Sequence, residues 1–294
     1  MPAPMNLLHY PRRAYDKYLV PYILHKRYRN VLDKNRDLKN LKRGRTCFIL
    51  GNGPSLNDLD LTRLSQEETF VVNSFWQHPQ YQDIKPKNYV LIDSDSFPKS
   101  EGETNACIED LINRKTVIST HPTKLFFNII GKNFIETQKL FPHNETYYLA
   151  LYGFFTENLK FNICLDKILP NVKNVIVACI ISAVYMGFER IYLLGCEHDF
   201  LAYPSTAHYE GFKHFYKTKQ FDLSNKEEVR YYALAAHSYE RHIDNVKTLF
   251  RNYRLLAWKL ARTHPQVEIY NATPKSFLDI FPMVKFEDIP LTNA

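Results

Sequence analysis

The stretch from Thr46 to Leu56, with the sequence TCFILGNGPSL, constrains the fold more than any other part of the chain. The residues Cys47–Leu50 are apolar or favour β-structure, and they predict a short buried strand. Gly51 and Gly53 then predict a tight turn, because glycine adopts positive φ without steric cost. The stretch therefore indicates a strand followed by a loop of bare backbone.

The end of the same stretch indicates a helix start and a place for an anion. Pro54 suits the first helical position, and Ser55 can satisfy a backbone N–H that lacks a partner. A loop of this kind presents backbone N–H groups to an anion, as phosphate-binding turns do. It lacks the third glycine of a dinucleotide fingerprint and the Gly-Lys ending of a Walker loop. The alternative is that the two glycines only make a turn.

Length and composition indicate a globular protein. The 294 residues can hold one large α/β domain with a small appendage, and 45% of them are hydrophobic. The net charge of +7 suits an anionic partner, either a nucleotide, an acidic glycan or an anionic membrane surface. Nucleic acid is not expected as a partner, because the sequence has no basic block and no known reader motif.

Cysteine usage and hydropathy bear on the compartment. The five cysteines form no Cys-x-x-Cys pair and indicate buried thiols in a reducing compartment. No secretory signal and no run of about 18 apolar residues is found. A cytoplasmic protein is therefore expected, with peripheral attachment to the inner face of the membrane as an option.

The N-terminal residues 1–45 differ from the rest of the chain. They are basic and rich in tyrosine, and they look helical from Ala14 onward. We expect them to form a segment apart from the main domain, 46–294. A basic aromatic helix can lie on an anionic membrane. It can equally pack against the domain or against a second subunit, so a homo-oligomer stays open.

Polar clusters follow the predicted strands. The strand at Phe70–Val72 ends in Asn73 and Ser74, the strand at 89–92 ends in Asp93, and a strand at Thr116–Ser119 ends in Thr120-His121-Pro122. In open α/β sheets, ligands bind at the carboxyl ends of the strands. We therefore predict a doubly wound, mostly parallel, Rossmann-like sheet with one nucleotide-binding site. Residues 123–170 are aromatic and irregular, and they are expected to be either an acceptor-side helical insertion or a few short covering helices.

The second half of the chain repeats the helix and strand pattern. Residues 172–186 predict a buried helix that stops at Gly187. A strand at Arg190–Leu194 follows and ends in Glu197, His198 and Asp199. A loop at 204–225, a long helix at 226–262 and a last strand at 267–270 complete the prediction.

Two of these units carry a resemblance to known families. The GNGPSL turn after a strand is similar to the opening of bacterial sialyltransferases of glycosyltransferase family 42. It also resembles the related domain-of-unknown-function-115 group, which includes motility accessory factors. The unit that runs from the buried helix at 172–186 through Gly187 to the strand at Arg190–Leu194 is similar to the helix, turn and strand in the second half of the family 42 sialyltransferases. The similarity covers separate short segments within residues 46–285, and the aromatic stretch 123–170 has no counterpart in it.

The resemblance implies an inverting glycosyltransferase that moves an acidic sugar of the sialic or nonulosonic type from a CMP-linked donor. The acceptor would be a bacterial surface glycan, as in lipopolysaccharide biosynthesis, or a glycoprotein. The chain departs from family 42 at the end of the third strand, where it has Asp93 in place of Asn. Asn174 lies near a donor-contacting Ser of the family. The expected donor-binding residues are Gly51, Asn52, Gly53, Ser55, Asn73, Ser74, Asp93, Glu197, His214 and Tyr216.

A histidine is the expected general base. Its pKa suits removal of a proton from an acceptor hydroxyl near neutral pH. His237 matches the order of elements in family 42, and His198 is the rival because Glu197 and Asp199 flank it. The expected catalytic residues are His237, His198 and Asp199.

A metal site is the main open question. Asp93 and Asp95 form an Asp-x-Asp pattern, with which many nucleotide-sugar transferases hold a divalent metal. The alternatives are a plain loop, because Asp and Ser are common in turns, and a direct contact with the ribose of the donor. No cofactor is required by a CMP donor, which has one phosphate. The alternatives are a metal-dependent UDP- or GDP-sugar transferase, a pterin pyrophosphokinase-like enzyme, and a non-enzymatic glycan- or nucleotide-binding protein docked on the membrane.

Overall fold

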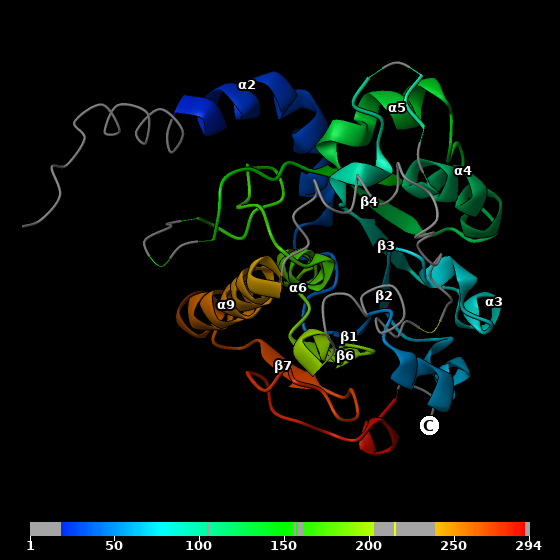
Figure 1. Cartoon of the computed structure of the whole chain (residues 1–294), viewed down its shortest axis with the longest axis vertical. Coiled ribbons are helices and arrows are strands. Elements are labelled where there is room, and N and C mark those ends of the chain that lie inside the picture. Colours follow the sequence, from blue (N-terminus) through cyan, green and yellow to red (C-terminus); the bar gives the residue numbers. More distant parts are fainter. Residues whose placement is uncertain are drawn as a thin grey trace, which may run out of the picture.

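The described part of the chain forms one parallel sheet with helices on both faces (Figure 1). The computed structural model describes residues 19–100, 102–104, 106–155, 157, 161–202, 215 and 239–291. The strands are β1 (Thr46–Leu50), β2 (Thr69–Val72), β3 (Asn88–Leu91), β4 (Lys124–Asn128), β5 (Thr146–Leu149), β6 (Arg190–Leu194) and β7 (Glu268–Asn271). Every neighbouring pair is parallel, which confirms the predicted doubly wound, Rossmann-like α/β class.

The strand order places a topological switch point between β1 and β6. The sheet runs β5-β4-β3-β2-β1-β6-β7, so the chain builds outward from β1 and then returns to its other side. The connections that follow β1 and β6 therefore lead to opposite halves of the sheet. A crevice opens at such a point, at the carboxyl ends of the strands.

The helices cover both faces. The α-helices are α2 (Val20–Asp33), α3 (Tyr81–Ile84), α4 (Ala106–Ile118), α5 (Lys132–Thr137), α6 (Val175–Met186) and α9 (Tyr239–Thr263). Short 3-10 turns are η2 (Lys34–Leu38), η3 (Pro54–Asp58), η4 (Leu61–Leu64), η5 (Phe75–Gln77), η6 (Ser94–Ser96), η7 (Ile129–Gly131), η8 (Phe200–Ala202) and η10 (Phe286–Asp288). None of the helices in the described ranges combines the length and apolar composition needed to cross a membrane.

The core divides into two clusters, one on each face of the sheet. Alternation along β1 sends Cys47 and Ile49 toward α6 and α9, and Phe48 and Leu50 toward the face that carries α4. Helix α6 is apolar all round, and every residue from 176 to 186 is buried. Burying a large aliphatic side chain contributes about 1.5–3 kcal/mol. The helix therefore fixes the position of its own N-terminus, which lies at the crevice.

The predicted strand at Thr116–Ser119 is wrong, because residues 106–118 form helix α4. Ile108, Leu111 and Ile118 lie on one helical face and are buried, so packing overrides the local β-preference of the β-branched residues. The polar residues 120–122 consequently precede β4 and lie at the amino end of the sheet, away from the crevice.

The aromatic stretch 123–170 is part of the sheet. It supplies β4 and β5, and its residues Phe126 and Tyr147 stack across the two strands with ring centroids 5.5 Å apart. Neither expectation for this stretch, an insertion or short covering helices, includes these strands. Asn128 ends β4 and occupies the carboxyl-end position that was expected for residues 120–122.

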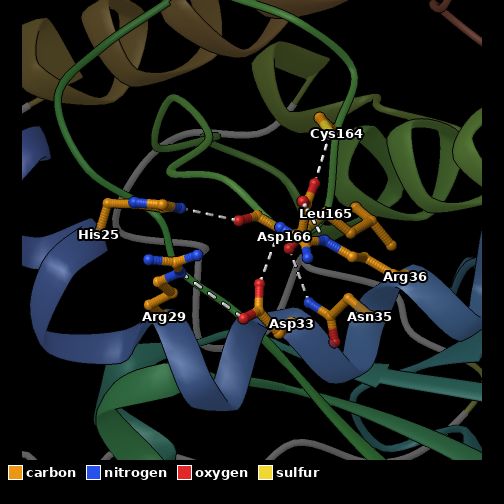
Figure 2. Close-up of polar contacts among 8 residues, drawn as sticks. All are labelled: His25, Arg29, Asp33, Asn35, Arg36, Cys164, Leu165 and Asp166. Carbon is orange, nitrogen blue, oxygen red and sulfur yellow. Dashed lines mark hydrogen bonds and ion pairs between the residues drawn. The ribbon is translucent and has the colours of Figure 1, made fainter.

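The N-terminal segment is tied to the domain from its middle onward. Leu32 and Leu38 are fully buried. Figure 2 shows the polar contacts that hold this segment, in which Arg36 pairs with Asp33 and with Asp166 at 2.9 Å each. The buried Asn35 amide donates to the Leu165 carbonyl at 2.7 Å. The boundary expected after residue 45 therefore falls inside one packed body.

Candidate functional site

A small cavity of about 100 Å³ lies between the loops that follow β1 and β6. Gly51–Pro54 lines it from one side, and Gly195 with Glu197–Phe200 lines it from the other. Asn73 at the end of β2 and Asn174–Ile176 at the start of α6 complete the wall. The first predicted turn and the Glu-His-Asp cluster thus meet at one place.

The two glycines of the turn are required by close approach of the neighbouring loop. Gly53 has φ −69°, and neither glycine adopts the positive φ that the sequence suggested. A Cβ on Gly51 would overlap the Gly195 carbonyl oxygen, and one on Gly53 would overlap the Glu197 carboxylate. The positive φ values at this site belong to Gly195 at 63°, His198 at 51° and Asn73 at 47°.

Three backbone N–H groups of the turn donate hydrogen bonds to acceptors of the protein itself. Gly51 N–H donates to the Leu194 carbonyl at 2.7 Å, and Gly53 N–H donates to the Gly195 carbonyl at 3.0 Å. Ser55 N–H donates to Glu197 Oε1 at 2.7 Å. Pro54 begins the 3-10 turn η3 rather than an α-helix, and Ser55 Oγ is buried without a partner among the described residues. A carboxylate of the protein thus occupies the position at which the sequence suggested a bound anion.

Glu197 is buried with half of its hydrogen-bonding capacity unused. The residue is 8% exposed. Its Oε1 accepts from Ser55, whereas its Oε2 is buried and has no partner in the described structure. A buried acceptor of this kind costs about 1–3 kcal/mol when it is left unpaired. Glu197 therefore keeps one buried acceptor atom whose hydrogen-bonding capacity is unused in the described structure.

A second cavity of about 590 Å³ adjoins the first at the ends of β2, β3 and β4. The two cavities share Asn73, Asn174 and Val175 in their linings. The larger one is also lined by Asp93, Ser94, Asn128, Asn171 and Lys173. The crevice as a whole is thus rich in amide side chains, with Asp93 and Lys173 as charged groups of its larger part.

Asn73 is held in a left-handed conformation at the junction of the two cavities. Its φ is 47°, which Asn tolerates better than most residues. Its carbonyl oxygen accepts from the Tyr89 hydroxyl and from Arg114 Nη1, the latter at 2.7 Å. Its side-chain Oδ1 is buried without a partner in the described structure. Asn73 is therefore a second acceptor at the crevice that lacks a donor.

The N-terminus of α6 faces both cavities. The Asn174 Oδ1 caps the helix by accepting from Ile176 N–H at 2.8 Å. The aligned peptide dipoles give such a terminus a partial positive charge that favours anions. Lys173 precedes the cap and adds a full positive charge to the larger cavity. The start of α6 is thus the electropositive part of the crevice.

His198 is buried and neutral. Burial lowers its pKa to about 4. Its Nε2 lies 2.8 Å from the Tyr253 hydroxyl of α9, and its ring stacks on Phe200. The Tyr253 hydroxyl also lies 3.5 Å from Asn174 Oδ1. These contacts connect α9 to the cap of α6 through the wall of the crevice.

The two carboxylates of the Asp-x-Asp pattern point to different partners. Asp93 Oδ1 accepts from Asp95 N–H at 3.1 Å, and Asp93 lines the larger cavity. Asp95 pairs with Lys99 at 3.0 Å and is 62% exposed. Within the described ranges, no group of three His, Cys, Asp or Glu side chains could hold a metal ion. Asp93 is therefore the member of the pattern that faces the crevice.

The structure brings most of the predicted site residues together. Gly51, Asn52, Gly53, Asn73, Asp93, Glu197, His198 and Asp199 line the two cavities. Ser55 contacts the site through its backbone, whereas Ser74 is the N-cap position of η5 and lines neither cavity. His237, His214 and Tyr216 lie outside the described residues. Sequence reasoning missed Lys173 and Tyr253, because neither belongs to a motif and both reach the site through long-range packing.

Sheet order and crevice together define an α/β protein of the Rossmann-like class, in which ligands bind at the switch point. Comparisons with protein-family models and with curated protein sequences gave no match. Among solved structures, the chain is similar to the one described as "Structure of MAf glycosyltransferase from Magnetospirillum magneticum AMB-1", with 14% identity and a TM-score of 0.46. The likeness covers 90% of this chain and 39% of that one, so this chain spans about two-fifths of its length.

Proposed function

We propose that the protein is a glycosyltransferase whose crevice binds a nucleotide-activated sugar. The observation that carries this proposal is the switch-point crevice, where GNGPSL meets Glu197 and the N-terminus of α6. Its two cavities, about 100 and 590 Å³, give room for the parts of a nucleotide sugar. The donor we propose is a CMP-linked acidic sugar, on the resemblance of the turn to family 42. The acceptor we propose is a glycan or glycoprotein.

The reaction we propose is a direct displacement. A base removes the proton of the acceptor hydroxyl, and the acceptor oxygen forms a bond to the anomeric carbon of the sugar. The bond from that carbon to the phosphate oxygen breaks, and the nucleoside monophosphate leaves with the electron pair. The crevice contributes by holding the donor in place for this attack.

We propose His237 as the general base of this reaction, and this residue lies outside the described residues. His198 suits this task less well, because a group with a pKa of about 4 is a weak base at neutral pH. Its ring also engages Tyr253 and lies in the wall of the crevice. We assign His198 a positioning role beside the donor.

Thermal shift with four nucleotides tests the proposal. Binding to the folded state raises the melting temperature with ligand concentration. We expect CMP to stabilise the protein with and without EDTA. Stabilisation by UDP or GDP that EDTA abolishes would favour the metal-dependent transferase, and stabilisation by ATP with magnesium would favour a pyrophosphokinase. No shift with any nucleotide would contradict the proposed function.

The outer face of α2 supports a peripheral membrane attachment, which we propose as an accompanying property. Leu19, Tyr22 and Ile23 are exposed by 46%, 65% and 47%. Lys26 and Arg27 follow them and are also exposed. Apolar side chains beside basic ones are what an anionic bilayer surface binds. The inner face of the same helix carries His25 and Leu32, which attach to the domain.

A further inference from the structure

We propose that Glu197 and Asn73 bind the ribose hydroxyls of the donor nucleotide, and that its phosphate lies at Lys173 and the start of α6. This inference rests on the proposed function, and it assigns the orientation of the nucleotide in the crevice. It reverses the expectation that the glycine turn holds the phosphate.

The glycine turn is unsuited to a phosphate in this structure. The Glu197 carboxylate lies against Gly53 and takes the Ser55 N–H at 2.7 Å. A phosphate beside this carboxylate would place two negative charges together in a poorly solvated site, where like charges repel strongly. The ligand group at this position must therefore be neutral or positive.

The unpaired atoms at this position are acceptors. Glu197 Oε2 and Asn73 Oδ1 are both buried without a partner in the described structure, and both residues line the smaller cavity. Each needs a hydrogen-bond donor, and a ribose supplies two adjacent hydroxyls. The cavity volume of about 100 Å³ is several times the roughly 10–15 Å³ that one water requires by the same measure, so the cavity can hold a group larger than a water.

The phosphate has a better position in the larger cavity. That cavity continues from the smaller one past Asn73 and Asn174, and its charged lining residues are Lys173 beside α6 and Asp93 at the end of β3. The capped N-terminus of α6 adds a partial positive charge there. A nucleotide with its ribose at Glu197 would place its phosphate within this electropositive part. The two ends of the crevice thus suit the two parts of one ligand.

Calorimetry with the unaltered protein tests the ribose assignment first. The probes are cytidine and 2′,3′-dideoxycytidine, which lacks both hydroxyls. Hydrogen bonds to charged groups contribute about 1.5–3 kcal/mol, so we expect the dideoxy compound to bind about 10- to 100-fold more weakly. Equal affinity for the two nucleosides would overturn the inference while leaving nucleotide binding intact. Failure of CMP and cytidine alike to bind would overturn the proposed function as well.

Two variants then separate the two ends of the ligand. Glu197→Gln should weaken cytidine binding about 10-fold and reduce the preference over the dideoxy compound, whereas Glu268→Gln at the edge of the sheet should not. Lys173→Met should weaken CMP binding but leave cytidine binding unchanged, and Lys167→Met, an exposed residue of the same region, is its control. Loss of cytidine affinity in Lys173→Met, or an unchanged CMP affinity, would contradict the placement of the phosphate.

Discussion

The Glu197 carboxylate lies directly against Gly53, so that any side chain at residue 53 would overlap it. Through its other oxygen, Glu197 also receives the Ser55 N–H at 2.7 Å. The loops after β1 and β6 are therefore one packed unit, although 142 residues separate Ser55 from Glu197 in the chain. Glycine is needed at residue 53 to admit this carboxylate.

Gly53→Ala should destabilise the fold because its methyl group displaces Glu197. Overpacking of this kind costs about 1–3 kcal/mol. The cost should fall in a Glu197→Ala background, where the obstructing side chain is gone. Urea denaturation of the four proteins in this cycle measures the coupling. The matched control is Gly51→Ala, which meets the backbone of Gly195 and should gain nothing from Glu197→Ala. Additive effects at 53 and 197 would contradict the packing account.

Tyr253→Phe should destabilise the protein by about 1–3 kcal/mol. The substitution removes the hydroxyl that contacts His198 Nε2 at 2.8 Å in a fully buried position. Tyr22→Phe provides the control, because that tyrosine is 65% exposed and should change the free energy of unfolding by less than about 0.5 kcal/mol. Equal changes in the free energy of unfolding for the two substitutions, measured by urea denaturation, would show that the Tyr253 hydroxyl does not stabilise the fold.

Stability should fall on acidification through the titration of His198. Burial lowers its pKa in the folded state to about 4, below the ordinary value near 6.5. The unfolded state therefore binds the proton first, and the stabilisation is present above about pH 6.5 and lost as pH falls toward 4. The shift corresponds to about 3 kcal/mol. His198→Asn, which tolerates the positive φ, should show a flatter pH dependence of its unfolding free energy. Parallel curves for the two proteins would contradict the prediction.

Substitution of the outer face of α2 should reduce membrane binding without affecting the fold. We expect the double variant Tyr22→Ser with Ile23→Ser to bind less to anionic vesicles in co-sedimentation. Its control is Leu41→Ser, which changes a side chain that is 51% exposed elsewhere on the domain. Binding by the unaltered protein should weaken as salt rises, because Lys26 and Arg27 contribute through screened charge. Equal co-sedimentation of the double variant and the control would favour a packing role for this face.

The sequence predicts those parts of the fold whose signal is local. Periodicity identifies β1, β6 and the buried helix α6, and strand ends identify Asn73, Asp93 and Glu197 as neighbours at one edge. The alternation of predicted strands and helices along the sequence likewise predicts the α/β class of the fold. These features depend on a few adjacent residues, which is why they are readable without a structure.

The remaining features depend on packing between distant segments. Thr116–Ile118 has β-preference, yet it ends a helix because Ile108 and Leu111 bury the same face. The glycine turn has the residues of an anion-binding loop, but a carboxylate 142 residues away from Ser55 occupies it. Tyr253 reaches His198 from α9. No local pattern encodes these approaches.

A crystal structure of the protein with CMP tests the central claim most directly. We predict electron density for the nucleotide between the loops that follow β1 and β6, with the ribose hydroxyls at Glu197 and Asn73 and the phosphate at Lys173. Density for the phosphate on the glycine turn would contradict the proposed orientation. Nucleotide bound away from the switch point, or a crevice that stays empty at saturating CMP, would contradict the claim that this crevice is the donor site.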